Sequence, residues 1–312
     1  MSVAVAIELG GSHAAVGLVN AHTLIAVEDI SLTPKAQLAR VLPNLAICIR
    51  RLLAQNNLAL NQVSGIGMGI AALVDWKSNR VVGTNGKYSD APSIDLVGWS
   101  KENFGLPLRL ENDARMGLLG EWYGGGLRNA DSAIMLTFGT GIGCAALVEG
   151  KVFRSSQPQG GCLGGHIPVN LNGRTCSCGA VGCMEAEAST WALPHILQGW
   201  PCIETSTLFG NTLGGFKELF DAVAEGDLVA EAVRRHCIRV WAAGIIGLIH
   251  VYGPSKVLLG GGVMKSPEMV IPDLRAFIHR HAWTPAGPVE IQVASLGPHS
   301  ALYGTIPLLE GR

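Results

Sequence analysis

The chain contains a close group of one histidine and three cysteines, His166, Cys176, Cys178 and Cys183. One imidazole and three thiolates are the ligand set of a closed tetrahedral zinc site, and a Cys-x-Cys-x4-Cys spacing lets one short loop supply three ligands. In an intracellular protein such a group indicates metal binding before it indicates disulfides. The alternative is four unrelated buried side chains. The pattern predicts a structural Zn²⁺ site, because four protein ligands leave no position open for a substrate.

Glycine-rich turns are the second feature with chemical potential. Two of them each separate a pair of apolar runs, and a third ends an apolar run; they are Gly10-Gly11-Ser12, Gly139-Thr140-Gly141 and Gly260-Gly261-Gly262. Backbone N–H groups in such turns can bind phosphate oxygens without steric hindrance. Ordinary hairpin turns are the alternative. Because the first two turns have matching surroundings, the pattern indicates a weak internal repeat, two related lobes and a nucleotide ligand.

Asp113 is the third feature. It follows a predicted strand over residues 108–110 and precedes a helix that is expected to run to about Tyr123. Open α/β sheets display reactive groups at the carboxyl ends of their strands, so this carboxylate is a candidate catalytic group. The alternative is a helix N-cap, a position to which Asp is well suited.

The elements that must position these groups alternate between strands and helices, which predicts an α/β protein. Residues 3–9, 14–19 and 23–32 read as strands, and Thr33-Pro34 predicts the start of a helix that continues to about Gln55. Further helices are expected over residues 185–197 and 228–252. A strand over residues 256–259 leads into the third glycine turn.

Composition excludes several classes of protein. The 312 residues are 48% hydrophobic and 15% charged, which is typical of a globular chain, and the formal net charge of −1 gives no electrostatic attraction for nucleic acid or an anionic membrane. The longest apolar stretch, residues 240–252, is too short to span a bilayer. The first ten residues lack a basic region and contain Glu8, which argues against a secretory signal. We therefore expect a cytoplasmic protein.

Taken together, the motifs resemble the ROK family of bacterial sugar kinases and sugar-responsive repressors. The resemblance spans nearly the whole chain and rests on Leu9-Gly10-Gly11-Ser12, Glu111-Asn112-Asp113-Ala114, Thr137-Phe138-Gly139-Thr140-Gly141-Ile142-Gly143, Gly165-His166, Cys176-Ser177-Cys178-Gly179, Gly182-Cys183-Met184-Glu185 and Leu259-Gly260-Gly261-Gly262-Val263. It implies the two-lobed actin-like ATPase (ribonuclease H-like) fold with a zinc-binding loop over residues 160–185. The N-terminal lobe would comprise residues 1–113 plus about 298–312, and the C-terminal lobe residues 114–297. ATP would lie in the cleft with a sugar beneath its terminal phosphate, and a homodimer is expected.

The resemblance also implies a role for each matching residue. Asp113 would act as the general base that accepts a proton from the sugar hydroxyl, with Mg²⁺ assisting phosphoryl transfer. Sugar hydroxyls would be bound by Asn112, Asp113, His166 and Glu185, and by Asn85 in the segment where the family's sugar-contacting loop tends to lie. The nucleotide would be bound by Gly10, Gly11, Ser12, Gly139, Thr140 and Gly141 at its phosphates and by Gly260, Gly261 and Gly262 at its nucleoside.

Two positions depart from the family pattern. Glu8 stands near the metal and phosphates where the family usually has Asp, so the charge is kept but moved by one methylene. Leu163 stands three residues before His166, where the family usually has a sugar-binding Glu. A site that loses a hydrogen-bonding carboxylate discriminates differently among sugars, so no particular sugar is predicted.

Two functions remain in competition. The first is an ATP-dependent kinase that phosphorylates a hydroxyl of a hexose or hexose derivative, as the presence of Asp113 indicates. The second is a catalytically weakened sugar-binding sensor or regulator, as Glu8 and Leu163 indicate. Because the first predicted strand begins at Val3, a preceding DNA-binding domain is not expected, and we expect a small-molecule sugar as partner with neither nucleic acid nor membrane.

Overall fold

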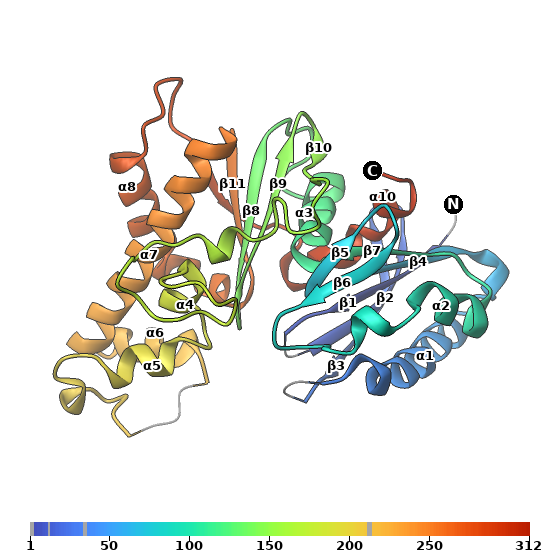
Figure 1. Cartoon of the computed structure of the whole chain (residues 1–312), viewed down its shortest axis with the longest axis horizontal. Coiled ribbons are helices and arrows are strands. Elements are labelled where there is room, and N and C mark those ends of the chain that lie inside the picture. The colour runs from blue at the N-terminus through green and yellow to red at the C-terminus, as the bar shows by residue number, and fades with distance from the viewer. Residues whose placement is uncertain (1–2, 12, 34–35, 211–213) are drawn as a thin grey trace. The chain divides into compact units, whose positions relative to one another are not determined.

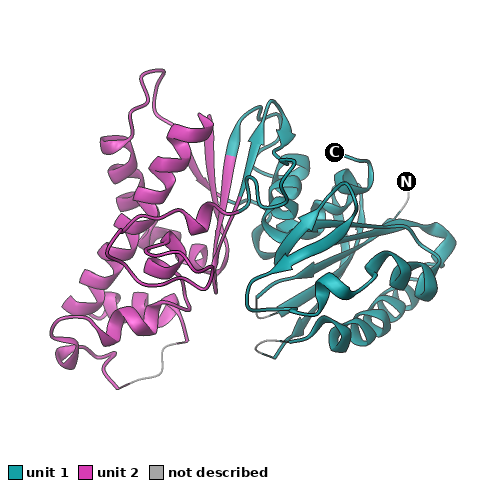
Figure 2. Cartoon of the chain, viewed as in Figure 1, with its two compact units in different colours: residues 1–133, 145–162, 294–312 teal, residues 134–144, 163–293 magenta. Residues whose placement is uncertain are grey.

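The computed structural model describes residues 3–11, 13–33, 36–210 and 214–312 (Figure 1). The chain divides into two compact units (Figure 2). Unit 1 comprises residues 1–133, 145–162 and 294–312, and unit 2 comprises residues 134–144 and 163–293. Each unit is therefore assembled from segments that lie far apart in the sequence.

Unit 1 is built on a five-stranded sheet of order β3-β2-β1-β4-β7. The first three strands are antiparallel neighbours, whereas β4 runs parallel to both β1 and β7. Unit 1 also contains a separate antiparallel two-stranded sheet, β5-β6. The strands of unit 1 up to Ala133 are β1 (Val3–Leu9), β2 (His13–Asn20), β3 (Thr23–Ser31), β4 (Val63–Ile70), β5 (Ala72–Asp75), β6 (Arg80–Thr84) and β7 (Leu108–Asn112).

The two faces of β1 differ in side-chain size, and this difference determines what covers them. Val5, Ile7 and Leu9 belong to a large buried cluster that includes the apolar side of helix α1 (Leu38–Gln55). Ala6 lies on the opposite face, in a small cluster with Leu302 of helix α9 (Ser300–Tyr303). Because side chains alternate along a strand, this pattern lets β1 be covered on both faces.

Helix α3 (Asp113–Gly124) packs unusually close to α9. A Cβ atom added to Gly120 would lie 1.8 Å from the carbonyl oxygen of Ser300, so the two helices meet backbone to backbone. This contact holds α3 against α9 within unit 1. The family resemblance implies a lobe boundary after Asp113, whereas the first segment of the compact unit continues to Ala133.

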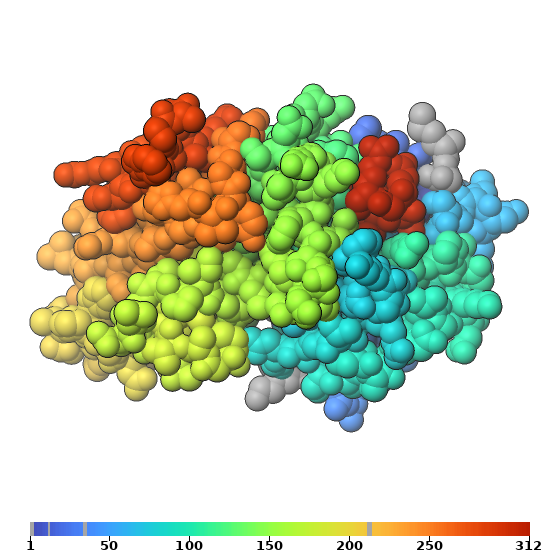
Figure 3. All heavy atoms as spheres, turned by 45° about the horizontal axis from the view of Figure 1, so that its top comes forward, coloured from blue at the N-terminus to red at the C-terminus, as the bar shows by residue number. Residues whose placement is uncertain are grey.

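A second five-stranded sheet has the order β10-β9-β8-β11-β12. Counted within each sheet, both have the order third, second, first, fourth, fifth strand, which agrees with the internal repeat expected from the two glycine turns. The strands are β8 (Ala133–Phe138), β9 (Ile142–Val148), β10 (Lys151–Val152), β11 (Lys256–Gly260) and β12 (Glu290–Val293). Figure 3 shows the dark-red C-terminal end of the chain on the surface beside the light-green segment around β10, where Arg154 Nη2 donates to the Arg312 carbonyl oxygen at 2.9 Å.

Helix positions agree with the expected ones in part. The expected helix over residues 228–252 is α7 (Leu228–Tyr252), but the helix expected to open at Thr33-Pro34 begins only at Leu38, and Pro34 lies outside the described residues. The single helical region expected over residues 185–197 is two short helices. The remaining α-helices are α2 (Leu96–Phe104), α4 (Met184–Ala188), α5 (Leu193–Gln198), α6 (Phe216–Ala224), α8 (Ile271–His281) and α10 (Thr305–Leu309).

Among the described residues, no helix has both the length and the apolar character needed to cross a bilayer.

Candidate functional site

Asp113 lies at the junction between β7 and α3, at the carboxyl end of a parallel strand. Its Oδ1 accepts hydrogen bonds from Asn112 Nδ2 at 3.0 Å and from the Ala114 backbone N–H at 2.9 Å. Burial raises the pKa of the Asp113 carboxyl to about 6, although these hydrogen bonds act in the opposite direction. Asn112, not Asp113, is the N-cap of α3, because its side chain accepts from the Arg115 N–H at 3.2 Å. The carboxylate of Asp113 therefore does not serve as the N-cap of α3.

Glu8 is the second carboxylate of this region. It lies near the end of β1, where its Oε2 is buried and has no hydrogen-bond partner among the described residues. Burial, together with the smaller effects of the nearby charges of Asp113 and Asp29, raises the pKa of Glu8 to about 8. Carboxylate oxygens are the ligands that Mg²⁺ prefers, so the unpartnered oxygen of Glu8 fits the hard cation that the family resemblance implies.

Glu8→Gln is expected to flatten the dependence of stability on pH. A carboxyl whose pKa rises from 4.5 to about 8 on folding contributes stability that is complete below pH 4.5 and is lost as the pH rises through about 8. Thermal melts between pH 5 and 9, without metal or nucleotide, should therefore show a smaller decline for Glu8→Gln than for the wild type. Glu102→Gln, at an exposed position of the same unit, is the control. Parallel curves for wild type and Glu8→Gln would contradict the assigned pKa.

The first glycine turn is closed by a hydrogen bond from the Gly10 N–H to the His13 carbonyl at 3.0 Å. The Gly10 carbonyl accepts a second hydrogen bond, at 2.9 Å, from the hydroxyl of Tyr88, which is fully buried. Burial and then the charge of Asp113 raise the pKa of this hydroxyl, so it stays a donor. Gly11 follows Gly10 in this turn, and Ser12 lies outside the described residues. Tyr88 links the turn to the exposed segment after β6 that contains Asn85.

A buried ion network supports the strand end that carries Asn112 and Asp113. Glu111 Oε1 accepts from the Asn112 N–H at 2.9 Å, and its Oε2 accepts from Arg154 Nε at 2.6 Å. Arg115 approaches Glu111 at 3.5 Å and donates to the carbonyl of Gly160. Sequence reasoning assigned no role to Glu111, Arg115, Arg154 or Tyr88. The only available signal was the place of Glu111 beside Asn112-Asp113.

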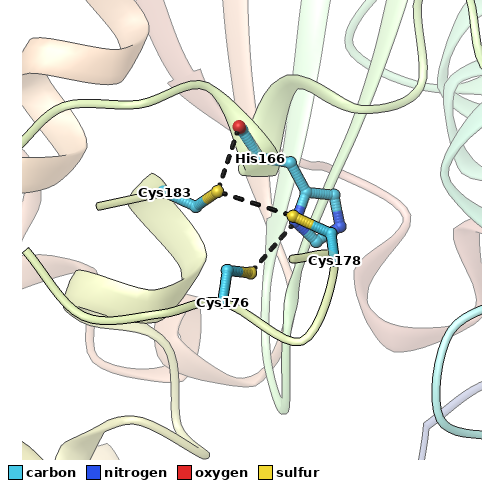
Figure 4. A group of neighbouring side chains, drawn as sticks. All are labelled: His166, Cys176, Cys178 and Cys183. Atoms are coloured by element: carbon cyan, nitrogen blue, oxygen red, sulfur yellow. Dashed lines mark hydrogen bonds between the residues drawn. The ribbon is translucent and has the colours of Figure 1, made fainter. Parts of the chain in front are cut away.

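The Cys/His cluster, consisting of His166, Cys176, Cys178 and Cys183, is brought together in unit 2 (Figure 4). One ligand atom from each residue lies within 4.8 Å of all the others. Cys178 Sγ and Cys183 Sγ are 3.7 Å apart, and Cys176 Sγ is 3.4 Å from His166 Nδ1. A tetrahedral zinc ion with Zn–S of about 2.3 Å and Zn–N of about 2.0 Å requires roughly 3.8 and 3.5 Å for these separations. The cluster therefore fits Zn²⁺, with Nδ1 as the ligand atom of His166.

The second glycine turn, residues 139–142, connects β8 to the start of β9 and is held from several sides. Its carbonyl oxygens at Gly139 and Thr140 accept from the N–H groups of Thr190 at 3.1 Å and Trp191 at 3.2 Å. The Ile142 N–H donates to Glu185 Oε2 at 2.8 Å. In the described part of the chain, the N–H groups of Thr140 and Gly141 have no acceptor, so they are available to an anionic ligand.

The third glycine turn lies against the same part of unit 2. Gly260 ends β11, and Gly261 has φ of 87° with so little space that an added Cβ would lie 2.3 Å from the Phe138 carbonyl. Gly262 begins the short 3₁₀ helix that follows. The structure thus places residues 260–262 beside the end of β8, next to Gly139.

Comparisons with known proteins agree on one family. A model of the ROK family matches residues 4–312. A glucokinase of Thermotoga maritima is 28% identical, with 99% of this chain and 97% of the relative covered. A solved ROK family glucokinase from Streptomyces griseus, in complex with glucose and AMPPNP, is similar with a TM-score of 0.80 at 26% identity, covering 97% of each chain. A xylose repressor of Caldicellulosiruptor bescii is 24% identical over 79% of this chain, and the match covers only 62% of the repressor.

Proposed function

Because the chain belongs to the ROK family and has its actin-like ATPase fold, we propose that it is an ATP-dependent kinase acting on a hydroxyl of a hexose or hexose derivative. The hydroxyl oxygen forms a bond to the γ-phosphorus of ATP, the bond from that phosphorus to the β,γ-bridging oxygen breaks, and ADP leaves. The hydroxyl proton passes to Asp113.

The placement of Asp113 is the observation that carries this proposal. The Asp113 side chain accepts hydrogen bonds from Asn112 Nδ2 and from the Ala114 backbone N–H, both at Oδ1. We assign the transferred proton to Oδ2. With a pKa of about 6 the Asp113 carboxylate is ionised at neutral pH, and this pKa is closer to neutral pH than the ordinary aspartate value of 3.8. A general base is most effective when its pKa approaches the working pH.

In unit 1 we assign Asn85 and Asn112 to the sugar and the Gly10-Gly11-Ser12 turn to phosphate, with the Gly10 N–H closing the turn through the His13 carbonyl. The buried, unpartnered oxygen of Glu8 supports its assignment to Mg²⁺. When bound, Mg²⁺ neutralises charge that develops on the phosphates. Glu8 then holds the cation at the end of β1.

In unit 2 we assign the free N–H groups of Thr140 and Gly141 to phosphate, with Gly139 closing their turn, and residues 260–262 to the nucleoside. The Cys/His cluster is assigned to structural Zn²⁺. Because Nδ1 of His166 faces the thiolates, Nε2 is the nitrogen left for a sugar hydroxyl. Glu185 is assigned to the sugar as well. The homodimer expected from the sequence stays a prediction.

A sugar-binding sensor is the second candidate. Leu163 stands where a carboxylate is expected in the family, and it is 40% exposed, so its side chain offers an apolar surface and no hydrogen-bonding group. The similarity to a xylose repressor supports the same candidate. A sensor would bind a sugar without phosphorylating it.

A phosphotransfer panel separates the two candidates. Wild-type protein is incubated with Mg-ATP and a set of hexoses, pentoses, amino sugars and their derivatives, and ADP release is followed by a coupled assay. We expect turnover on at least one hexose or hexose derivative. If calorimetry shows that a sugar binds but no ADP forms in its presence, the sensor is favoured. Absence of both nucleotide binding and turnover would overturn the proposed kinase function.

A further inference from the structure

Glu185 connects two parts of unit 2 that the proposed function treats separately. It is the second residue of α4, whose N-cap is Cys183 of the Cys/His cluster. Its side chain is 8% exposed, so its carboxylate interacts with protein groups rather than with bulk water.

Both oxygens of this carboxylate have protein donors. Oε2 accepts from the Ile142 N–H at 2.8 Å, and Oε1 accepts from Trp191 Nε1 at 3.3 Å. Contact with the 139–142 turn is close, because a Cβ added to Gly141 would lie 2.4 Å from Oε2. Glu185 thus packs directly on the backbone of this turn.

The rest of the turn is fixed by the segment that follows α4. The N–H groups of Thr190 and Trp191 bind the carbonyls of Gly139 and Thr140, and the Gly139 N–H binds the Gly141 carbonyl at 3.0 Å. With these carbonyls and the Ile142 N–H engaged, the peptide planes of the turn have a defined orientation. That orientation determines where the unengaged N–H groups of Thr140 and Gly141 point.

We propose that Glu185 is a positioning residue for nucleotide binding. It fixes the 139–142 turn to the segment that carries the Cys/His cluster, so that the Thr140 and Gly141 N–H groups are presented to phosphate. This inference rests on the proposed function, since it needs a nucleotide as ligand. It adds to the sugar-binding role assigned to Glu185, and the two roles differ in which ligand responds to a change at this position.

A carboxylate is needed for this role. It can accept hydrogen bonds at both oxygens, and hydrogen bonds to an ionised acceptor are about twice as strong as neutral ones. A glutamine has one acceptor oxygen and two N–H donors, so one of its ends must face the Ile142 N–H or the Trp191 N–H with a donor of its own. Glu185→Gln therefore loosens the turn without changing side-chain size.

The test measures nucleotide affinity in the absence of sugar. Binding of Mg-AMPPNP to Glu185→Gln, Trp191→Phe and wild type is followed by calorimetry, and zinc content is measured in each. We expect Glu185→Gln to raise the Kd about tenfold, which corresponds to the loss of one charged hydrogen bond. Trp191→Phe keeps the Ile142 bond and removes only the donor to Oε1, so its Kd should change by no more than about threefold.

Gly141→Ala tests the same contact from the other side and replaces Glu185→Gln if that variant does not fold. Its added methyl group would displace the carboxylate, and we expect a similar rise in Kd with zinc retained. Nucleotide affinity unchanged in Glu185→Gln, or in Gly141→Ala where it stands in, would overturn the inference, as would an equal loss in Trp191→Phe. Wild-type protein that does not bind Mg-AMPPNP would instead overturn the proposed kinase function.

Discussion

Asp113→Asn is expected to reduce phosphotransfer by a factor of about 10² to 10⁴, the usual contribution of a general base. Asparagine has nearly the same shape as aspartate and keeps an acceptor for the Ala114 N–H, but it cannot take up a proton. The change should lower kcat far more than it raises KM for the sugar. Coupled ADP release with the best sugar of the panel measures both.

Loss of activity in Asp113→Asn should not come from unfolding. The pKa of Asp113 is about 6 when folded against an ordinary 3.8, so its ionisation above pH 4 lowers the stability of the folded protein. Replacing it by a neutral side chain should leave the melting temperature at pH 7.5 equal or higher. A lower melting temperature would count against this explanation.

The pH profile gives an independent measure of the same group. Because the base must be ionised, kcat/KM should fall as the pH drops through about 6, the pKa of Asp113. Asp95→Asn is a matched control, since Asp95 is an exposed aspartate at a helix start in the same unit, where it caps α2 by accepting from the Gly98 N–H at 2.9 Å. Its activity and pH profile should match the wild type. Full activity in Asp113→Asn would require a different base.

Local sequence patterns predicted the features that depend on short stretches of chain. The strand, glycine turn and strand units appear as β1-β2 and β8-β9, and α7 has the predicted bounds. The Cys/His cluster was predictable because three of its members lie within eight residues, and the position of Asp113 was predictable because a strand gives way to a helix there. In each of these cases the decisive contacts are near in sequence.

Features that depend on distant pairings could not be predicted in this way. Tyr88 binds Gly10 across 78 residues, and Glu111 binds Arg154 across 43. The helix expected over residues 185–197 is interrupted because the N–H groups of Thr190 and Trp191 bind the 139–142 turn instead of continuing a helix. Sequence periodicity does not identify such a partner, because the hydrogen bonds exist only when the 139–142 turn and the segment after α4 lie side by side.

Removal of zinc is expected to lower the free energy of unfolding, and to change it more than the substitutions Glu8→Gln and Asp113→Asn. Metal analysis of the purified protein should find about one Zn²⁺ per chain. Structural zinc sites contribute apparent binding free energies of about 10 to 16 kcal/mol in small zinc-binding peptides, and even a fraction of that amount lost from unit 2 would lower its melting temperature by roughly 10 °C. Treatment with a strong chelator at neutral pH should produce this shift, and adding Zn²⁺ back should reverse it.

Two exposed cysteines of unit 2 supply a matched pair of variants. Cys178 belongs to the Cys/His cluster and Cys202 does not, so Cys178→Ser should lose the zinc whereas Cys202→Ser should retain it. Because we propose His166 both as a zinc ligand and as a sugar ligand, Cys178→Ser should also weaken sugar binding, while Cys202→Ser should not. Zinc absent from the wild type, or bound equally by both variants, would show that the cluster is not the metal site. Zinc loss with unchanged sugar affinity would separate His166 from the sugar and leave the metal with a structural role alone.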